Sequence, residues 1–252
     1  MEFTLWPLES VDAGPPTDVV FAFPKFRSGF PTLVNRLSFD IPPIGELVWS
    51  IGYTGFKWPD GGIPIDAVRN GTFDWHNSYG HRLVVVEGTV QRIFTQRFAR
   101  GYLEGACFSF DAEIHHAQSG GPVISLDGIV RGVNSAGATQ FFDHPASLAS
   151  LLHPFLFSTL RFGVQMGPVR INATHRLIDL IAQGTISTDG SEENVSISQD
   201  HNTGHPAVNP RAAVAMSDYI HDDFKSFQQS RKATTKTGTI YRIRIKENEQ
   251  GP

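Results

Sequence analysis

The amino-acid sequence predicts an all-β protein built from short strands, with helices only in its C-terminal part. Its 252 residues include 24 glycines, 16 prolines and 19 phenylalanines, which suits many short strands joined by tight turns. Between residues 46 and 134, apolar runs recur and are separated by Gly, Asp and Asn, the pattern of a β-sandwich or barrel. With 40% hydrophobic and 18% charged residues, the chain has enough apolar mass for a real core.

The first 44 residues contain two short strand signals and then a proline-rich stretch. We expect strands at residues 2–6 and 18–23, separated by a turn at Gly14-Pro15-Pro16. Residues 28–44 contain one glycine and three prolines, so we expect a linker there. The strand signals resume after Gly45, and six further ranges are predicted as strands: 47–53, 82–86, 88–94, 105–110, 122–125 and 128–134.

After residue 145 the pattern changes toward helices. Leucines recur at helical spacing in 146–160, interrupted by Pro154, and a second helical pattern in 175–182 stops before Gly184. Residues 185–210 are rich in Ser, Asp, Asn, Gly and Pro, which predicts a loop. Two more elements are expected beyond it, a third helix at 211–229 and a half-exposed strand at 241–245.

Charge and cysteine content narrow the classes of partner and compartment. A net charge of -4 argues against binding to nucleic acid or to an anionic membrane surface. No run reaches the roughly 18 apolar residues that span a bilayer, so we expect no membrane insertion. The single cysteine, Cys107, excludes an intrachain disulfide and is expected to be a packed strand residue. We expect a cytoplasmic protein, with export left open if the true N-terminus lies upstream, because Met1 to Pro16 show no signal peptide.

The segment that points to chemistry is Gln118-Ser119-Gly120-Gly121-Pro122. It predicts a tight loop with a hydroxyl at its tip, where glycines leave room for a substrate carbonyl and backbone N–H groups can face a developing oxyanion. The alternative interpretation is an ordinary surface turn, since Ser and Gly are common in turns. A metal site at His115-His116 is not expected, because metal ligands rarely occupy consecutive positions. No cofactor is predicted.

The residues around this loop resemble the bacterial high-temperature-requirement branch of the trypsin-like, chymotrypsin-fold serine proteases. That branch has an Asp-Ala-x-Ile run, then Asn-Ser-Gly-Gly-Pro, then a Gly-x-Val-x-Gly-Val hairpin. Here the matching segments are Asp111 to Ile114, Ser119 to Pro122 and Gly128 to Val133. The strand at 18–23 and the run from Gly45 to Tyr53 are similar to two further strands of the family. The resemblance spans roughly residues 2 to 165 and implies a double β-barrel with a truncated first barrel.

The resemblance implies a role for each matching residue. Ser119 takes the position of the nucleophile, and Asp18 takes that of the aspartate that orients the catalytic histidine. The N–H groups of Ala117 and Ser119 stand where the family binds the oxyanion. The remaining residues are expected to contact an extended peptide substrate. Glu113 falls near the base of the primary pocket, His116 shapes that pocket, and the strand Asn134-Ser135-Ala136-Gly137 pairs with the peptide.

The same resemblance divides the chain into four expected parts. They are a remnant of the first β-barrel at 1–27, an inter-barrel linker at 28–44, a second β-barrel with the nucleophile loop at 45–165, and a C-terminal helical and linker extension with a late strand at 166–252.

Two departures from the family bear on activity. The family's catalytic histidine precedes the aspartate by about 40 residues, whereas the first histidine of this sequence is His76, well after Asp18. We therefore expect the general base to lie in an N-terminal segment upstream of this chain. Ala117 replaces a glycine, and its Cβ disfavours the backbone conformations that glycine adopts freely.

Three hypotheses follow for function. The first is that the chain is a fragment of a working serine endopeptidase that hydrolyses peptide bonds by acyl transfer to Ser119. The second is a pseudoprotease that binds peptides or proteins without cleaving them. The third is an unrelated β-barrel binding protein whose serine lies in a turn. The first is favoured, because two strands of a first barrel leave unpaired edges and uncovered apolar side chains such as Val20 and Phe21. We expect these 252 residues alone to be poorly stable and to show negligible turnover; the oligomeric state stays open.

Overall fold

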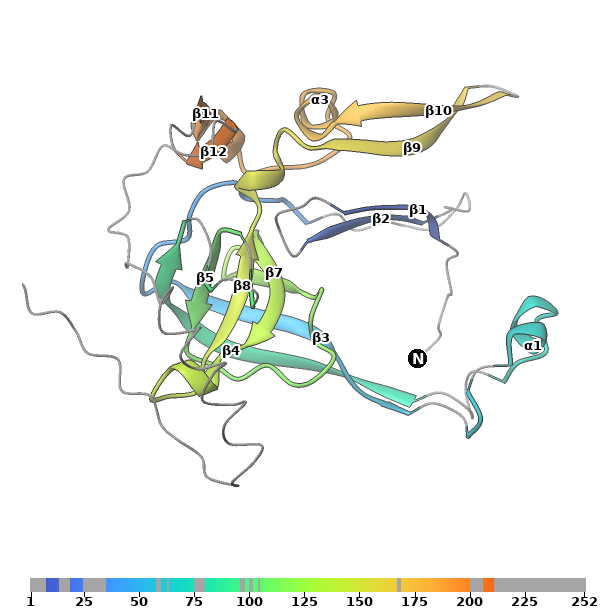
Figure 1. The fold of residues 1–252 in the computed structure, drawn as a ribbon, viewed down its shortest axis with the longest axis horizontal. Helices are drawn as coiled ribbons and strands as arrows, with labels where there is room; N and C mark the ends of the chain where they lie inside the picture. The colour runs from blue at the N-terminus through green and yellow to red at the C-terminus, as the bar shows by residue number, and fades with distance from the viewer. Residues whose placement is uncertain are drawn as a thin grey trace, which may run out of the picture.

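A closed β-barrel dominates the structure, a computed structural model that describes residues 8–13, 19–24, 35–57, 60–62, 64–74, 80–95, 98–99, 102–103, 105–166, 169–199 and 206–210 (Figure 1). The barrel contains six antiparallel strands in the order β3-β4-β5-β8-β7-β6, and β6 pairs back with β3. Their bounds are β3 Leu47–Lys57, β4 Gly80–Phe94, β5 Cys107–Phe110, β6 Pro122–Ser125, β7 Val130–Gly137 and β8 Ser147–Leu151. The predicted all-β barrel architecture is confirmed, and its strands lie within residues 47–151.

The barrel forms because alternate side chains of its strands point inward. The strands and the segments beside them bury one continuous apolar cluster: Ile41, Val48, Val90, Ile93, Ala106, Phe108, Phe110, Ala112, Ile114, Val123, Ala149 and Leu151. A second cluster covers one side of the barrel and includes Phe94, Phe98, Leu103 and Cys107. Cys107 is fully buried in β5, as the sequence predicts. The predicted ranges 82–86 and 88–94 form one strand, β4, whose ends pair with two different neighbours.

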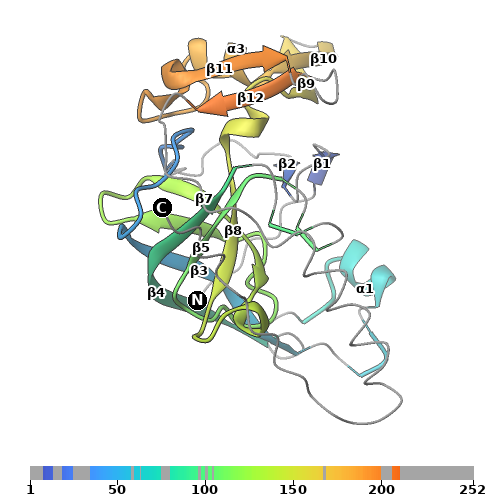
Figure 2. The same cartoon turned by 60° about the vertical axis from the view of Figure 1, so that its left-hand side comes forward.

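Strands β3 and β4 continue beyond the barrel as a long hairpin. Their pairing runs from Leu47 opposite Thr89 to Lys57 opposite Gly80. The chain between them carries the short helix α1, Ile65–Arg69, which lies away from the barrel (Figure 2). The hairpin matters for the site, because the backbone of β3 beyond its pairing with β6 lies against the loop that contains Ser119.

A separate two-stranded sheet precedes the barrel in sequence. It consists of β1, Leu8–Ala13, and β2, Val20–Pro24. Val20 is 54% exposed, as the sequence reasoning expects, whereas Phe21 is half-buried and meets Phe155 edge to face at 5.6 Å. The second half of the expected linker, residues 35–44, is bonded to the barrel: the N–H of Ser38 donates to the carbonyl of Val130 at 2.9 Å.

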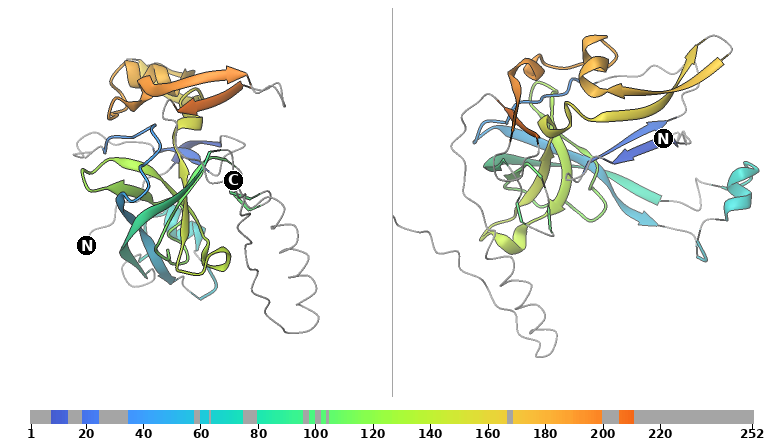
Figure 3. Two further views of the ribbon diagram at one scale, coloured as in Figure 1. Left: turned by 90° about the vertical axis from the view of Figure 1, so that its left-hand side faces the viewer. Right: turned by 45° about the horizontal axis from the view of Figure 1, so that its top comes forward.

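The C-terminal part packs over one end of the barrel (Figures 1 and 3). It contains the hairpin of β9, Thr159–Met166, and β10, Val169–Arg176, followed by α3, Leu177–Ala182. A second hairpin joins β11, Val195–Gln199, to β12, Pro206–Pro210. Three 3-10 turns complete the described elements: η1 Thr139–Phe141, η2 His153–Phe155 and η3 Ser191–Asn194. No helix among the described residues is long and apolar enough to cross a membrane.

Two sequence expectations for this part are wrong, and one is confirmed. The helix expected at 146–160 is instead strand β8 followed by η2, because residues 147–151 are fully enclosed between β5 and β7. The loop expected at 185–210 contains η3, β11 and all of β12. The helix expected at 175–182 forms as α3, although its first two residues belong to β10. The strands expected at 2–6 and 241–245 and the helix expected at 211–229 lie outside the described residues.

Candidate functional site: a serine loop at one edge of the barrel

Ser119 lies exposed in the loop between β5 and β6, three residues before β6 begins. The loop is held against strand β3 by two close backbone approaches. A Cβ added at Gly121 would stand 1.9 Å from the carbonyl oxygen of Ile51, and one added at Gly52 would stand 3.0 Å from the Cα of Gln118. Both glycines are therefore required by the contact between loop and strand, and they fix where Ser119 stands.

The backbone N–H groups of this loop fall into two sets. Three of them donate to carbonyl oxygens: Gln118 to His115 at 3.1 Å, Gly120 to Asn134 at 2.8 Å and Gly121 to Gln118 at 3.1 Å. The N–H groups of Ala117 and Ser119 have no acceptor among the described residues. These are the two donors that the sequence analysis predicts for an oxyanion site. The loop thus leaves one such N–H on each side of Gln118, in the same loop as the exposed hydroxyl of Ser119.

Ala117 has a backbone φ of +74°, and it is the only non-glycine among the described residues with a positive φ. The sequence reasoning expects alanine to resist the conformation that glycine would adopt here. The structure places alanine in that left-handed conformation, which costs about 1–2 kcal/mol relative to the right-handed region. Bonds to Thr54 and His115 flank this strained residue, since the carbonyl of His116 accepts from the hydroxyl of Thr54 and the N–H of Gln118 donates to the carbonyl of His115.

Two buried amide side chains brace the loop from inside. Gln118 is fully buried; its Oε1 accepts from the N–H of His115 at 2.5 Å, and its Nε2 donates to the carbonyl of Val84 at 3.4 Å. Asn134 is 1% exposed, and its Oδ1 accepts from the hydroxyl of Ser50 at 2.9 Å. Buried amides of this kind are stable only when their polar atoms are bonded. Gln118 thus ties the loop to β4, and Asn134 ties β3 to β7, whose backbone bonds the loop at Gly120 and Gly121. The sequence reasoning missed Ser50, although Gln118 was visible in the motif.

The hydroxyl of Ser119 donates to the carbonyl oxygen of Ser135 at 2.9 Å, and no described histidine is hydrogen-bonded to it. Ser135 belongs to β7, the strand expected to pair with a peptide. On one side β7 pairs with β8 as far as Gly137, whereas on the other side its pairing with β6 ends at Val133. Residues 135–137 therefore present an edge that no strand of the barrel occupies, directly beside Ser119.

Of the other predicted site residues, Glu113 and His116 lie on the surface and Asp18 lies outside the described residues. Glu113 and His116 are exposed, and the carbonyl of His116 accepts from the hydroxyl of Thr54 at 2.8 Å. Between them Ile114 is buried, and its N–H donates to the hydroxyl of Ser147 at 3.0 Å. The sequence reasoning did not identify Ser147, which is buried in β8. The predicted orienting aspartate, Asp18, lies outside the described residues.

One histidine of the described part of the chain is buried, and it lies in η2 rather than in the serine loop. His153 is 1% exposed, and neither of its ring nitrogens has a hydrogen-bond partner among the described residues. Burial lowers the pKa of His153 to about 4, so the ring is neutral at pH 7. No group of three or more His, Cys, Asp or Glu side chains that could hold a metal occurs within the ranges that the structure describes.

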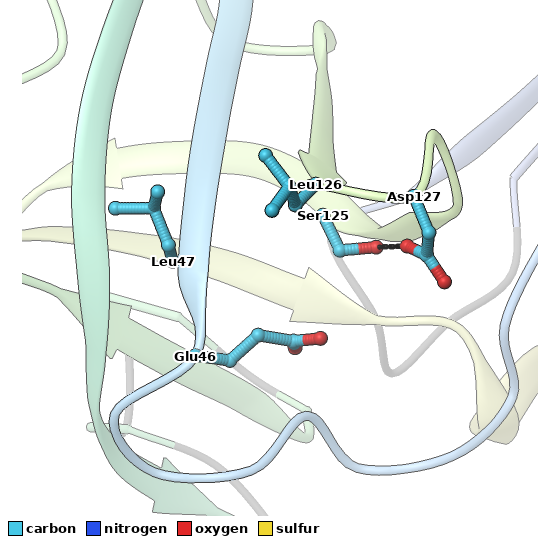
Figure 4. Close-up of a pocket in the computed structure, with 5 residues that line it drawn as sticks. All are labelled: Glu46, Leu47, Ser125, Leu126 and Asp127. Atoms are coloured by element: carbon cyan, nitrogen blue, oxygen red, sulfur yellow. Dashed lines mark hydrogen bonds between the residues drawn. The ribbon is translucent and has the colours of Figure 1, made fainter.

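A hollow of about 490 Å³ lies elsewhere on the barrel and is lined by Glu46, Leu47, Ser125, Leu126 and Asp127 (Figure 4). Ser125 ends β6, whereas Ser119 precedes the first residue of that strand, so the hollow is at the opposite end of β6 from the serine loop. Its acidic side chains are engaged internally: Glu46 pairs with Arg131 at 2.7 Å, and Asp127 accepts from the hydroxyl of Ser125 at 2.5 Å. The hollow is not part of the candidate site.

Comparisons with known proteins give matches among solved structures. No protein-family model and no curated protein sequence matches the chain. Fifty-eight chains of solved structures match. The active form of the Rv3671c protease from M. tuberculosis is 18% identical with a TM-score of 0.39, and the match covers 58% of this chain and 54% of that one. The inactive form of the same protease has a TM-score of 0.38 at 18% identity, with 58% and 62% covered.

The Nocardiopsis protease is also 18% identical, with a TM-score of 0.34, and the match covers 59% of this chain and 68% of that one. The chain spans about half the length of the Rv3671c protease structure in its active form. With TM-scores below 0.5 and identities below 25%, these likenesses do not decide what this chain does.

Proposed function

We propose that this chain contains the nucleophile-bearing barrel of a serine endopeptidase-like protein and that Ser119 is its nucleophile. The observation that carries the proposal is that one loop holds both an exposed serine hydroxyl and two N–H groups, those of Ala117 and Ser119, that have no acceptor among the described residues. A tetrahedral intermediate on Ser119 carries a negative oxygen, and two backbone donors preorganised beside it stabilise that charge. Removing one such donor costs about 100- to 1,000-fold in kcat in enzymes that use them.

The proposed reaction is acyl transfer from a peptide bond to Ser119. The Oγ of Ser119 forms a bond to the scissile carbonyl carbon, its proton passes to a general base, and the C–N bond breaks as the protonated amine leaves. Water then releases the acyl group. An extended peptide pairs with residues 135–137 of the predicted strand 134–137, because the backbone N–H and carbonyl of Asn134 already bond to Gly121 and Gly120. Glu113 is assigned to the base of the primary pocket, and His116 shapes that pocket. We assign the orienting role to Asp18, and no described histidine is hydrogen-bonded to Ser119 to act as the general base.

This chain is proposed to turn over substrate negligibly. The Ser119 hydroxyl donates to a backbone carbonyl, and a carbonyl oxygen cannot serve as the general base that accepts its proton. The same observation favours the second candidate function, a pseudoprotease that binds a peptide or protein at the β7 edge. Both candidates use the same loop and edge, and they differ in whether Ser119 can be acylated once a base is available.

An external base can separate these two candidates. Imidazole at tens of millimolar can accept the Ser119 proton while Oγ attacks a fluorophosphonate probe and fluoride leaves. We expect labelling of Ser119 to be very slow in buffer and to accelerate with added imidazole, as measured by mass spectrometry of the labelled peptide. Ser119→Ala should abolish labelling, whereas Ser187→Ala, at another exposed serine, should not.

Two results would contradict the proposal in different ways. Labelling of Ser119 in buffer at the rate of a working protease would show that a general base is already present. The proposal that this chain is inactive would then be wrong. Labelling that imidazole does not accelerate, and that matches the background at Ser187, would leave Ser119 as an ordinary surface serine. The binding-module function would then be preferred.

A further inference from the structure

The free edge of β7 carries two carbonyl oxygens that an extended peptide would pair with, those of Ser135 and Gly137. The N–H of Ala138 donates to the carbonyl of Ala146 on the β8 side at 2.7 Å. Because backbone groups of successive strand residues alternate in direction, the carbonyl of Gly137 is directed to the opposite edge. That edge lies beyond Val133, the last residue of β7 that pairs with β6.

Both of these carbonyls are occupied by side-chain hydroxyls of the chain itself. Ser119 donates to Ser135, and the hydroxyl of Tyr102 donates to Gly137. The Tyr102 hydroxyl also accepts from the Nε2 of Gln140 at 3.0 Å. Its donor and acceptor capacities are therefore both used, which fixes the hydroxyl over the edge.

The ring of Tyr102 is anchored in a cluster of aromatic side chains beside the edge. It meets Phe141 edge to face at 5.0 Å and Phe98 at 6.0 Å, and Phe98 is fully buried. A tight turn positions the ring, since the N–H of Leu103 donates to the carbonyl of Ala99 at 3.1 Å and both residues are buried. A hydroxyl held by this much packing stays over Gly137 unless a ligand displaces it.

We propose that Tyr102 closes the peptide-pairing edge of β7 at Gly137 and so determines how far along the strand a bound peptide can pair. A peptide N–H that bonds to Gly137 must displace the Tyr102 hydroxyl, and it exchanges one hydrogen bond for another. Pairing at this position therefore adds little affinity while Tyr102 is present. The inference rests on the proposed function, because it takes residues 135–137 as the docking edge, but it does not depend on acylation of Ser119.

The test compares two proteins, one with Ser119→Ala alone and one with Ser119→Ala and Tyr102→Phe together. Both lack the Ser119 hydroxyl, so no covalent step contributes to binding. Phenylalanine keeps the ring packing and removes only the hydroxyl. The probe is an acetylated and amidated peptide of five alanines flanked by lysines, titrated by NMR, because its small side chains leave binding to the backbone. We expect the Tyr102→Phe protein to bind the peptide about three- to tenfold more tightly, because the carbonyl of Gly137 is then free to accept a peptide N–H. Tyr53→Phe on the outer hairpin, where Tyr53 is 43% exposed, should leave the affinity unchanged.

A set of probes, each N-methylated at one alanine, then identifies the carbonyl involved. One analogue lacks the N–H that pairs with Gly137, and for this analogue Tyr102→Phe should give no gain in affinity. The protein that keeps Tyr102 should bind this analogue and the parent peptide equally well. A hydroxyl that only braces its turn would instead lower the melting temperature in Tyr102→Phe without raising peptide affinity. That result overturns the inference, as does a lack of binding to the Tyr102→Phe protein. Neither affects the imidazole test of Ser119, so failure of the two proposals can be told apart.

Discussion

Replacement of Gly121 by alanine tests whether the contact between loop and strand positions Ser119. The Cβ of alanine would stand 1.9 Å from the carbonyl oxygen of Ile51, whereas Cβ contacts below 3.0 Å essentially never occur. The obstacle is backbone on both sides, so no side-chain rotation can relieve it. Either the serine loop or strand β3 must move by about 1 Å.

The cost of that movement can be worked out from what the loop holds. Overpacking of a well-packed site costs about 1–3 kcal/mol. The shift also strains the bond in which the carbonyl of Gly121 accepts from the N–H of Asn134 at 2.8 Å, and loss of such a bond at a buried residue costs about 1 kcal/mol more. We therefore expect Gly121→Ala to lower the free energy of unfolding by about 2–4 kcal/mol.

Urea denaturation followed by tryptophan fluorescence measures this change, since Trp49 lies in β3 beside the contact. Gly137→Ala is the matched control, because a Cβ there meets nothing within 4 Å, and its unfolding midpoint should stay near that of the parent chain. If Gly121→Ala and Gly137→Ala unfold within about 0.5 kcal/mol of each other, the close approach of Gly121 to Ile51 does not hold the loop.

Three further predictions concern the strain at Ala117, the pH dependence that His153 causes and the accessibility of Cys107. Ala117→Gly should raise the free energy of unfolding by up to about 1 kcal/mol, because it relieves the left-handed alanine. Ala182→Gly, at the last residue of the right-handed helix α3, should not raise it. Urea denaturation measures both. Acidification should destabilise the fold between pH 6.5 and about 4, where the unfolded chain protonates His153 and the folded chain does not. The loss reaches about 3 kcal/mol, and His153→Leu should remove this part of the pH dependence. Burial raises the pKa of the Cys107 thiol far above its usual range, so a maleimide should label it only after unfolding, as mass spectrometry would show.

The barrel strands could be predicted from the sequence because their pattern is local. Leu47 to Tyr53 and Pro122 to Ser125 are short runs rich in apolar and β-branched residues with turn residues at their ends, and both form strands close to the expected bounds. The serine loop could be located for a similar reason. Gly120, Gly121 and Pro122 restrict the backbone so strongly that the sequence alone indicates a tight turn with Ser119 at its tip.

Strand β8 shows where local patterns fail. Leucines at 148, 151, 152 and 156 have helical spacing, yet Ser147–Leu151 forms the strand between β5 and β7 with all five residues buried. A fully enclosed strand has no polar face, so it lacks the alternation that distinguishes a strand from a helix. Pairing with two neighbours that are distant in sequence decides the outcome, and that pairing is not visible within the segment.

The hairpin of β11 and β12 could not be predicted from composition. The segment 185–210 is polar overall and was expected to be a loop, although Val195 and Ile197 alternate with serines as in a strand. Long-range contacts also account for the residues that were missed near the site. Ser50, Ser147 and Tyr102 each meet the site through bonds to residues at least 33 positions away, and a motif search around Ser119 cannot find such partners.

The structure separates the groups that hold the serine loop from the groups proposed to act on a substrate. Gln118 and Gly121 face β3 and carry the supporting contacts, whereas Ala117 and Ser119 are exposed and leave their N–H groups unbonded. The two sets alternate along the chain, so Ser119→Ala removes the hydroxyl and its hydrogen bond to the carbonyl of Ser135 but keeps the contacts through which Gln118 and Gly121 hold the loop against β3. A loss of labelling in Ser119→Ala with an unchanged unfolding midpoint is therefore a loss at the site, while the same loss in Gly121→Ala is a loss of the fold that presents it.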